Sequence, residues 1–147
     1  MRTIEAGERA TMGTLDVDEC LVLLRWEPIG RLAFADSGAA PIVVPVNFVV
    51  DGDSMVFRSG DSAKLDRLRE RPASLQVDRF DLYRKVGWSV LVRGVTHEVT
   101  MDEDMSGLDL EPWAPGRRDH WVRLVPDAIT GRRLQLTDGP IDRRGYL

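Results

Sequence analysis

The residues best suited to chemistry lie together, where one element is expected to end and a helix to begin. Arg58 and Ser59 end an apolar run, and Ser62 and Lys64 follow in the first turn of a helix predicted over 62–71. A helix N-terminus presents unpaired N–H groups with partial positive charge, which favour a phosphate. The arginine adds a planar fork of donors, the lysine a point charge and the serines hydroxyls. The stretch predicts a phosphate cradle, and a capped helix with two solvated charges is the alternative.

The second candidate is an apolar run over 41–50, whose composition predicts a strand covered on both faces. Pro45 removes one donor from the ladder, so it belongs at an edge, at a bulge or against a ligand. Asn47 places a polar amide in the same run and needs a hydrogen-bond partner if it is buried. A flat heteroaromatic ring with carbonyl and nitrogen groups would supply that partner. In the alternative, Pro45 kinks an edge strand and Asn47 bonds to backbone.

The third candidate is a long alternating strand predicted over 88–99. Its alternation places Trp88, Val90 and Val92 on one side and Ser89 on the other. Trp88 could cover an aromatic ligand, and a place in the core is the alternative.

The elements that would position these residues are mostly short strands. A polar arm is expected over 1–12, followed by one domain over 13–147 that opens with a short helix capped by Asp16 and stopped by Pro28. A short acidic helix is expected over 101–110. Six or seven strands with few helices predict a mainly β, antiparallel barrel; the strands are expected at 29–35, 41–50, 55–59, 73–80, 88–99, 120–125 and 129–136.

Composition narrows the function classes. The 147 residues carry a net charge of −4, which argues against nucleic acid as the main partner. The single cysteine excludes an intrachain disulfide and a multi-cysteine metal site, and two histidines far apart in sequence do not suggest a metal centre. We find no apolar leader at the N-terminus and no run of membrane-spanning length, so we expect a cytoplasmic protein without a membrane partner.

Taken in order, these motifs form a family pattern. A Gly-Arg-Leu-Ala strand at 30–33 is followed by the apolar run at 41–48, the Asp51-Gly52 turn, the stretch from Val56 to Lys64 and the strand beginning Gly-Trp-Ser-Val at 87–90. Over about residues 13–135 the chain resembles the FMN-binding split-barrel superfamily that includes pyridoxamine 5′-phosphate oxidase. It is most similar to the short oxidase-like proteins common in actinobacteria.

This resemblance implies a split barrel, an FMN cofactor and a homodimer with two flavin sites at its interface. It implies a flavin-dependent oxidoreductase that acts on a small molecule whose identity the sequence does not give. The implied cofactor contacts are Arg58, Ser59, Ser62 and Lys64 at the phosphate, Val44, Pro45, Val46 and Asn47 along the isoalloxazine, and Trp88 and Ser89 from the long strand. The partner subunit would complete the site, with Trp113, Trp121 and Arg123 as the corresponding candidates in this sequence.

The chain also departs from the pattern. True pyridoxamine 5′-phosphate oxidases end in a substrate-binding segment with an Arg-x-His signature, which this sequence lacks. We therefore do not expect vitamin B6 oxidation. Some relatives use a deazaflavin and a few bind haem, so a deazaflavin-dependent reductase, a non-catalytic flavin protein and a haem protein with His97 or His120 as axial ligand are the alternatives.

The cradle makes a direct prediction. Arg58→Ala or Lys64→Ala removes a charge-assisted phosphate contact worth roughly 1.5–3 kcal/mol, so FMN affinity should fall about tenfold or more. Titration of FMN by fluorescence quenching measures the effect. Unchanged affinity in both variants would remove the cradle.

Overall fold

A computed structural model describes residues 8–60, 68–99, 105, 107–116 and 120–138. The elements follow the order of one strand, one helix and six further strands. Their bounds are β1 Glu8–Leu15, α1 Val17–Arg25, β2 Ile29–Phe34, β3 Ile42–Asp51, β4 Ser54–Ser59, β5 Arg71–Asp81, β6 Val86–Glu98 and β7 His120–Asp138. The mainly β, antiparallel barrel predicted from the sequence is confirmed.

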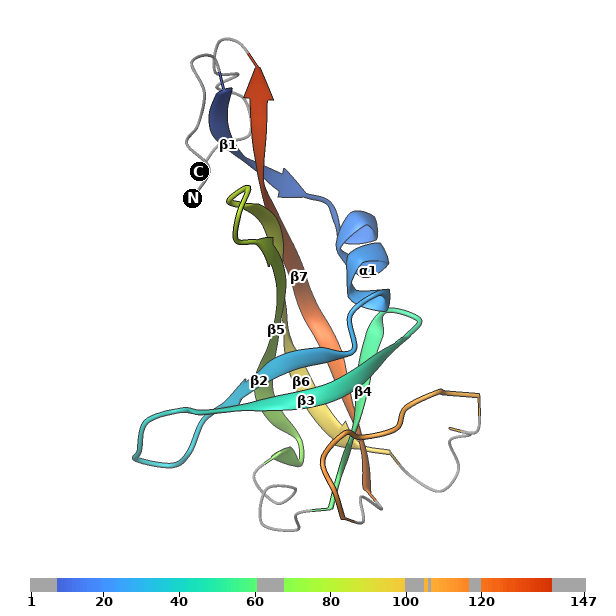
Figure 1. Ribbon diagram of the computed structural model, residues 1–147. Coiled ribbons are helices and arrows are strands. Elements are labelled where there is room, and N and C mark those ends of the chain that lie inside the picture. The colour runs from blue at the N-terminus through green and yellow to red at the C-terminus, as the bar shows by residue number, and fades with distance from the viewer. Residues whose placement is uncertain (1–7, 61–67, 100–104, 106, 117–119, 139–147) are drawn as a thin grey trace.

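Six strands close the barrel in the order β7-β4-β3-β2-β5-β6, and β6 pairs back onto β7. The long β7 makes this closure, because its first part pairs with β4 and its last part pairs with β1, while β6 accompanies it across both. Figure 1 shows β7 running the length of the molecule, with the short β1 alongside its far end. The strands of the predicted phosphate cradle and of the predicted ring site, β4 and β3, are thus neighbours in one sheet.

The helix α1 forms as the sequence predicts. Asp16 accepts from the backbone N–H of Glu19, and the Glu19 side chain returns to the N–H of Asp16, so the capping box is complete. Cys20 and Leu24 are fully buried against the barrel, and α1 therefore covers part of the core. Burial and then the nearby carboxylates raise the pKa of the Cys20 thiol, which disfavours the nucleophilic thiolate. No helix among the described residues is long and apolar enough to cross a membrane.

The core lies inside the barrel and obeys the two-residue period of its strands. Val90 and Val92 of β6 face inward with Leu75 and Val77 of β5, and all four are at most 1% exposed. Trp88 also packs on this cluster, from the same side of β6 as Val90. The alternation predicted for the long strand is therefore correct, and it assigns Trp88 to the core side.

Two sequence expectations about strands differ from the structure. Residues 8–12, expected in a polar arm, belong to β1 and pair with residues 134–138 of β7, since backbone pairing does not require an apolar sequence. The two strands expected at 120–125 and 129–136 are one strand, because a bulge at Asp127, next to Pro126, does not end the pairing with β6. The folded part of the chain therefore begins earlier than the sequence suggested, and one long strand replaces two short ones.

Two further helices were expected, over 101–110 and over 62–71. The acidic helix expected over 101–110 does not extend through residues 107–110, where the N–H of Leu108 donates to the Met105 carbonyl and the N–H of Leu110 to the Leu108 carbonyl in short turns. Leu110 is only 8% exposed there, so burial of one side chain against the barrel prevails over helix formation. Most of the helix expected over 62–71 lies outside the described residues; Leu68, which is described, is fully buried.

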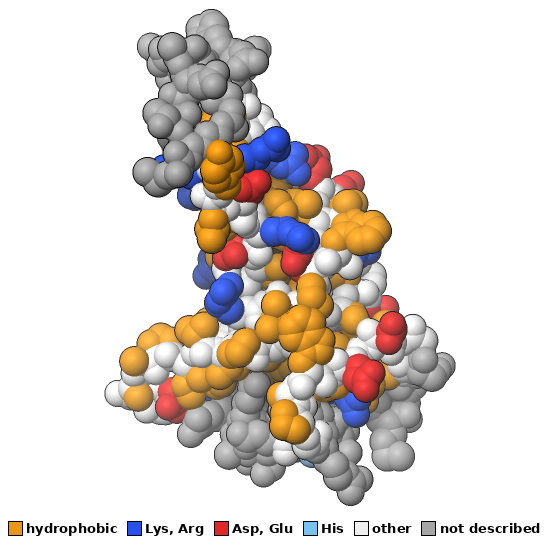
Figure 2. Space-filling model, in the orientation of Figure 1, with side chains coloured by type: hydrophobic (Ala, Val, Ile, Leu, Met, Phe, Trp, Pro, Cys, Tyr) orange, Lys and Arg blue, Asp and Glu red, His pale blue; other side chains and the backbone are white. Residues whose placement is uncertain are grey.

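One face of β3 is open in the single chain. Val43 is 59% exposed and Pro45 is exposed, whereas Val46 and Phe48 point into the core. Hydrophobic side chains extend along the β2–β3 hairpin in the face shown in Figure 2. The covering expected on both faces is therefore present on one only, and the outer face of β3 is available to a ligand or to another chain.

The bulge predicts a clear stability effect. A Cβ added at Gly94 would overlap the carbonyl oxygen of Val125 and crowd Pro126, so Gly94→Ala should lower the free energy of unfolding by about 1–3 kcal/mol or more. Gly13→Ala in β1 is the matched control, because nothing lies within 4 Å of its added Cβ. Urea denaturation measures both variants, and equal stabilities would contradict the packing assigned to the bulge.

Candidate functional site

Arg58 stands on the outer face of β4, opposite Trp121 of β7. Its guanidinium lies 5.0 Å from the centroid of the Trp121 ring, a cation–π arrangement, and its Nη1 donates to the carbonyl of Leu110 at 3.5 Å. Ser59, the next residue, is 1% exposed and pairs with His120. A half-buried cation is thus held in a fixed place beside the end of β4, where an anion could approach it.

Asn47 lies on the neighbouring strand and connects two other segments. Its Nδ2 donates to the carbonyl of Pro28 at 3.1 Å, and its Oδ1 accepts from the backbone N–H of Trp113 at 2.8 Å. The alternative in which Asn47 bonds to backbone therefore describes this single chain. Pro45 pairs only toward β2, because β4 joins β3 from Phe48 onward, so its missing N–H lies along an edge.

The other predicted ring contacts divide between the two faces of the barrel. Val46 is buried and Val44 packs against the core, whereas Pro45 and Asn47 are on the outward side of β3. On β6, Trp88 faces the core and Ser89 faces outward, since successive strand residues alternate. One chain therefore brings Pro45, Asn47 and Arg58 onto one surface and leaves Trp88 on the other side of the sheet. Ser62 and Lys64 lie outside the described residues.

Trp113, Trp121 and Arg123 were expected to complete the site from a partner subunit. In the structure they lie beside this chain's own β3 and β4. Arg123 donates to the Asp51 carboxylate at 2.8 Å and to the Ser54 hydroxyl at 2.5 Å, and so fixes the β3–β4 turn. Sequence analysis missed the role of the segment around Leu110 and Trp113, whose backbone contacts Arg58 and Asn47. Backbone partners leave no signal in residue type.

Both histidines are bound to carboxylates. His97 Nδ1 lies 2.8 Å from Glu70 Oε1, and His120 Nδ1 lies 2.9 Å from Glu98 Oε1. Glu98 also pairs with Arg69 at 3.1 Å, so it ties the start of β7 to the chain after residue 68. Among the described residues, no three His, Cys, Asp or Glu side chains gather as a metal site.

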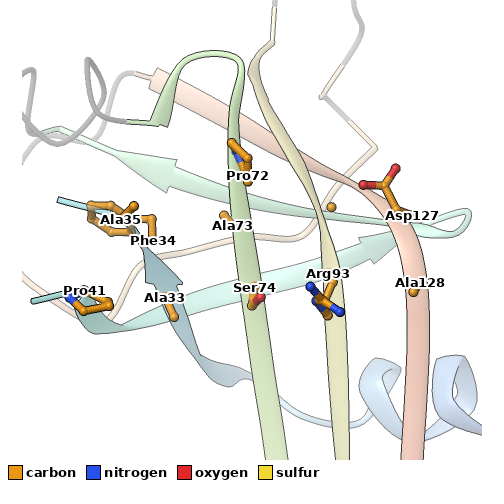
Figure 3. A pocket seen from close by; sticks show the side chains of 11 residues that line it. Ala33, Phe34, Ala35, Pro41, Pro72, Ala73, Ser74, Arg93, Asp127 and Ala128 are labelled. Carbon is orange, nitrogen blue, oxygen red and sulfur yellow. The ribbon is translucent and has the colours of Figure 1, made fainter. Parts of the chain in front are cut away.

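Two hollows adjoin the outer surface. The first, of about 320 Å³, lies between the end of α1 and the segment at 109–113, and Asn47, Trp26 and Trp113 line it. The second, of about 510 Å³, includes Arg93 and Asp127 but none of the predicted site residues. Figure 3 shows its floor of small side chains on neighbouring strands, with Arg93 from β6 and Asp127 from the bulge of β7. The hollow containing Asn47 is therefore the one continuous with the predicted site.

Comparisons with known proteins bear on the family and the fold of the chain. Residues 16–133 match the sequence profile of the family described as pyridoxamine 5′-phosphate oxidase. The uncharacterized protein Rv0080 of Mycobacterium tuberculosis is 31% identical over 82% of this chain and 84% of its own. An FAD binding protein from Mycobacterium smegmatis is 30% identical, with a TM-score of 0.67 over 84% of this chain and 99% of that chain. An FAD-binding protein from Mesorhizobium loti is 26% identical, with a TM-score of 0.68 over 83% and 97%.

The two hydrogen bonds of Asn47 should make a measurable contribution to the stability of the fold. Asn47→Leu removes both, at about 0.5–1.5 kcal/mol each, so the free energy of unfolding should fall by about 1–3 kcal/mol. Gln135→Leu is the control, because it replaces an exposed amide and should change stability by about 0.5 kcal/mol at most. Thermal or urea unfolding compares the two. A loss no larger in Asn47→Leu than in the control would show that the two bonds do not hold the loops.

Proposed function

Because the chain belongs to the pyridoxamine 5′-phosphate oxidase family, we propose that it is a flavin-dependent oxidoreductase that acts on a small molecule. The observation that carries the proposal is the joint placement of Arg58 and Asn47 on adjacent strands, next to the open face of β3. The similarity to two FAD-binding proteins at 26% identity or more supports a flavin as the ligand.

The described residues fit the two ends of such a cofactor. The guanidinium of Arg58 supplies a fixed cation for the phosphate, with the Ser59 backbone beside it at the end of β4. The exposed side chains of Pro45 and Val43 offer an apolar platform for a flat ring on the outer face of β3. A bound flavin would supply hydride or electron transfer, and the protein would orient the ring and leave one side open.

A homodimer is the second part of the proposal. Val43 and Ile29 are 59% and 40% exposed, Pro45 is exposed as well, and the pairing of β2 with β3 places all three on the outward side of the barrel. Apolar side chains exposed together on a sheet mark an interface more often than a free surface. A second copy seated there would cover the ring platform and could add contacts to each flavin.

One experiment tests cofactor and assembly together. Sedimentation at micromolar concentration, followed at the visible absorbance band of a flavin, should show the colour moving with a species of twice 16.5 kDa. A species of one chain mass that holds flavin stoichiometrically would contradict the shared site. If the protein binds no flavin when FMN or FAD is supplied, the proposed flavin cofactor is wrong.

Turnover separates an enzyme from a carrier. The flavin complex is mixed anaerobically with a panel of two-electron donors, including reduced nicotinamide dinucleotides, and the visible band is followed. Faster bleaching than with free flavin under the same conditions supports an oxidoreductase. Bleaching no faster than free flavin across the panel favours a flavin-binding protein without this activity.

A further inference from the structure

The smaller hollow has two unusual walls. Trp26 ends α1 on one wall and is 79% exposed, and Trp113 lies on the other wall and is 68% exposed. Tryptophan is a side chain that folding normally covers to a large extent, so two exposed rings on one small hollow need a reason. The hollow measures about 320 Å³, which is at the lower end of volumes for small-molecule sites.

A single side chain holds the two walls. Asn47 donates to Pro28, two residues after Trp26, and accepts from the backbone of Trp113 itself. Because Asn47 lies on a strand of the barrel, it attaches both tryptophan-bearing segments to the same rigid element. The backbone segments that carry the two rings are therefore placed by the fold, as segments of a preformed binding site are.

The hollow also adjoins the proposed phosphate cradle. Leu110 lines it, and the carbonyl of Leu110 accepts from Arg58. A ligand whose phosphate meets Arg58 would therefore have the hollow next to that phosphate. FMN ends at its phosphate, whereas FAD continues from the same phosphate into a second phosphate, a ribose and an adenine.

The charged side chains of the hollow favour some cofactor groups beyond the phosphate over others. Glu27 pairs with Arg79 at 3.3 Å, and Arg25, which also lines the hollow, donates to the carbonyl of Gly52. Asp109 and Glu111 line the hollow too and are exposed, so carboxylates outnumber cations in its lining. Carboxylates accept hydrogen bonds from the hydroxyls of a ribose, as acidic residues do in dinucleotide sites. They repel an anionic tail such as that of a deazaflavin cofactor. The hollow thus suits a neutral aromatic base that carries a ribose diol.

We propose that the hollow between Trp26 and Trp113 binds the adenosine half of FAD, with the adenine stacked on the tryptophan rings and the ribose hydroxyls donating to Asp109 and Glu111. This inference rests on the proposed flavin site at Arg58 and adds to it the choice of FAD over FMN.

The test is a paired titration of FAD and FMN against the full chain and its variants, with flavin fluorescence as the readout. Native protein should bind FAD more tightly than FMN. Trp26→Ala and Trp113→Ala should each weaken FAD binding by about tenfold, the loss expected for one base–aromatic stack, and leave FMN affinity unchanged. Tyr83→Ala is the matched control, because Tyr83 is a 64% exposed aromatic in the β5–β6 turn. Free adenosine should compete with FAD and not with FMN.

The outcomes separate this inference from the proposed function. Equal affinities for FAD and FMN, with both unaffected by the tryptophan variants, would overturn the adenosine site and leave the flavin site standing. A parallel loss of FAD and FMN together with dissociation into single chains would assign the two tryptophans to a second copy instead. Tighter binding of a deazaflavin cofactor than of FAD would also overturn the inference. Binding of neither flavin would reject the flavin site and, with it, the inference that rests on it.

Discussion

The pairing of β6 with β7 is the constraint on which the rest of the molecule depends. This ladder runs from Gly87 opposite Leu134 to Glu98 opposite Val122, and it alone turns an open sheet into a closed barrel. A strand as long as β7 must bend to pair with two neighbours in turn, and its bulge at Asp127, beside Gly94 of β6, provides the bend. Closure then fixes β4 against β7, and so fixes Arg58 beside Trp121.

Because successive residues of a strand face opposite sides, that register decides which side chains reach the outer surface. Arg58 and Asn47 face outward because their neighbours Phe57 and Phe48 face the core, where each is at most 2% exposed. A slip of one residue would bury the guanidinium and expose a phenylalanine, which costs far more than any surface contact could return. The same hydrophobic burial that stabilises the barrel therefore holds the candidate site in place without a dedicated structural device.

The sequence predicted those elements that are decided by interactions between near neighbours in the chain. The capping box at Asp16 and the tight turn at Asp51 with Gly52, whose φ is 64°, use contacts between near neighbours, and both elements form where expected. The burial of Leu110 and the backbone bonds of Asn47 and Arg58 join residues 19 to 66 positions apart. Residue types do not encode such pairings, so the segment at 107–113 and its place in the candidate site emerged only from the structure.

The two hydrogen bonds of Asn47 show how one amide can hold the fold and still keep polar groups for the proposed ligand. A side-chain amide has two N–H donors and two acceptor lone pairs, and its bonds to Pro28 and Trp113 use one of each. In the part of the chain that the structure describes, one donor and one acceptor are left to meet a polar ring edge. Because the used pair already fixes the plane of the amide, the remaining pair has a defined direction before any ligand arrives. Ordering entropy that a flexible amide would lose on binding has thus been lost on folding, which favours affinity at this position.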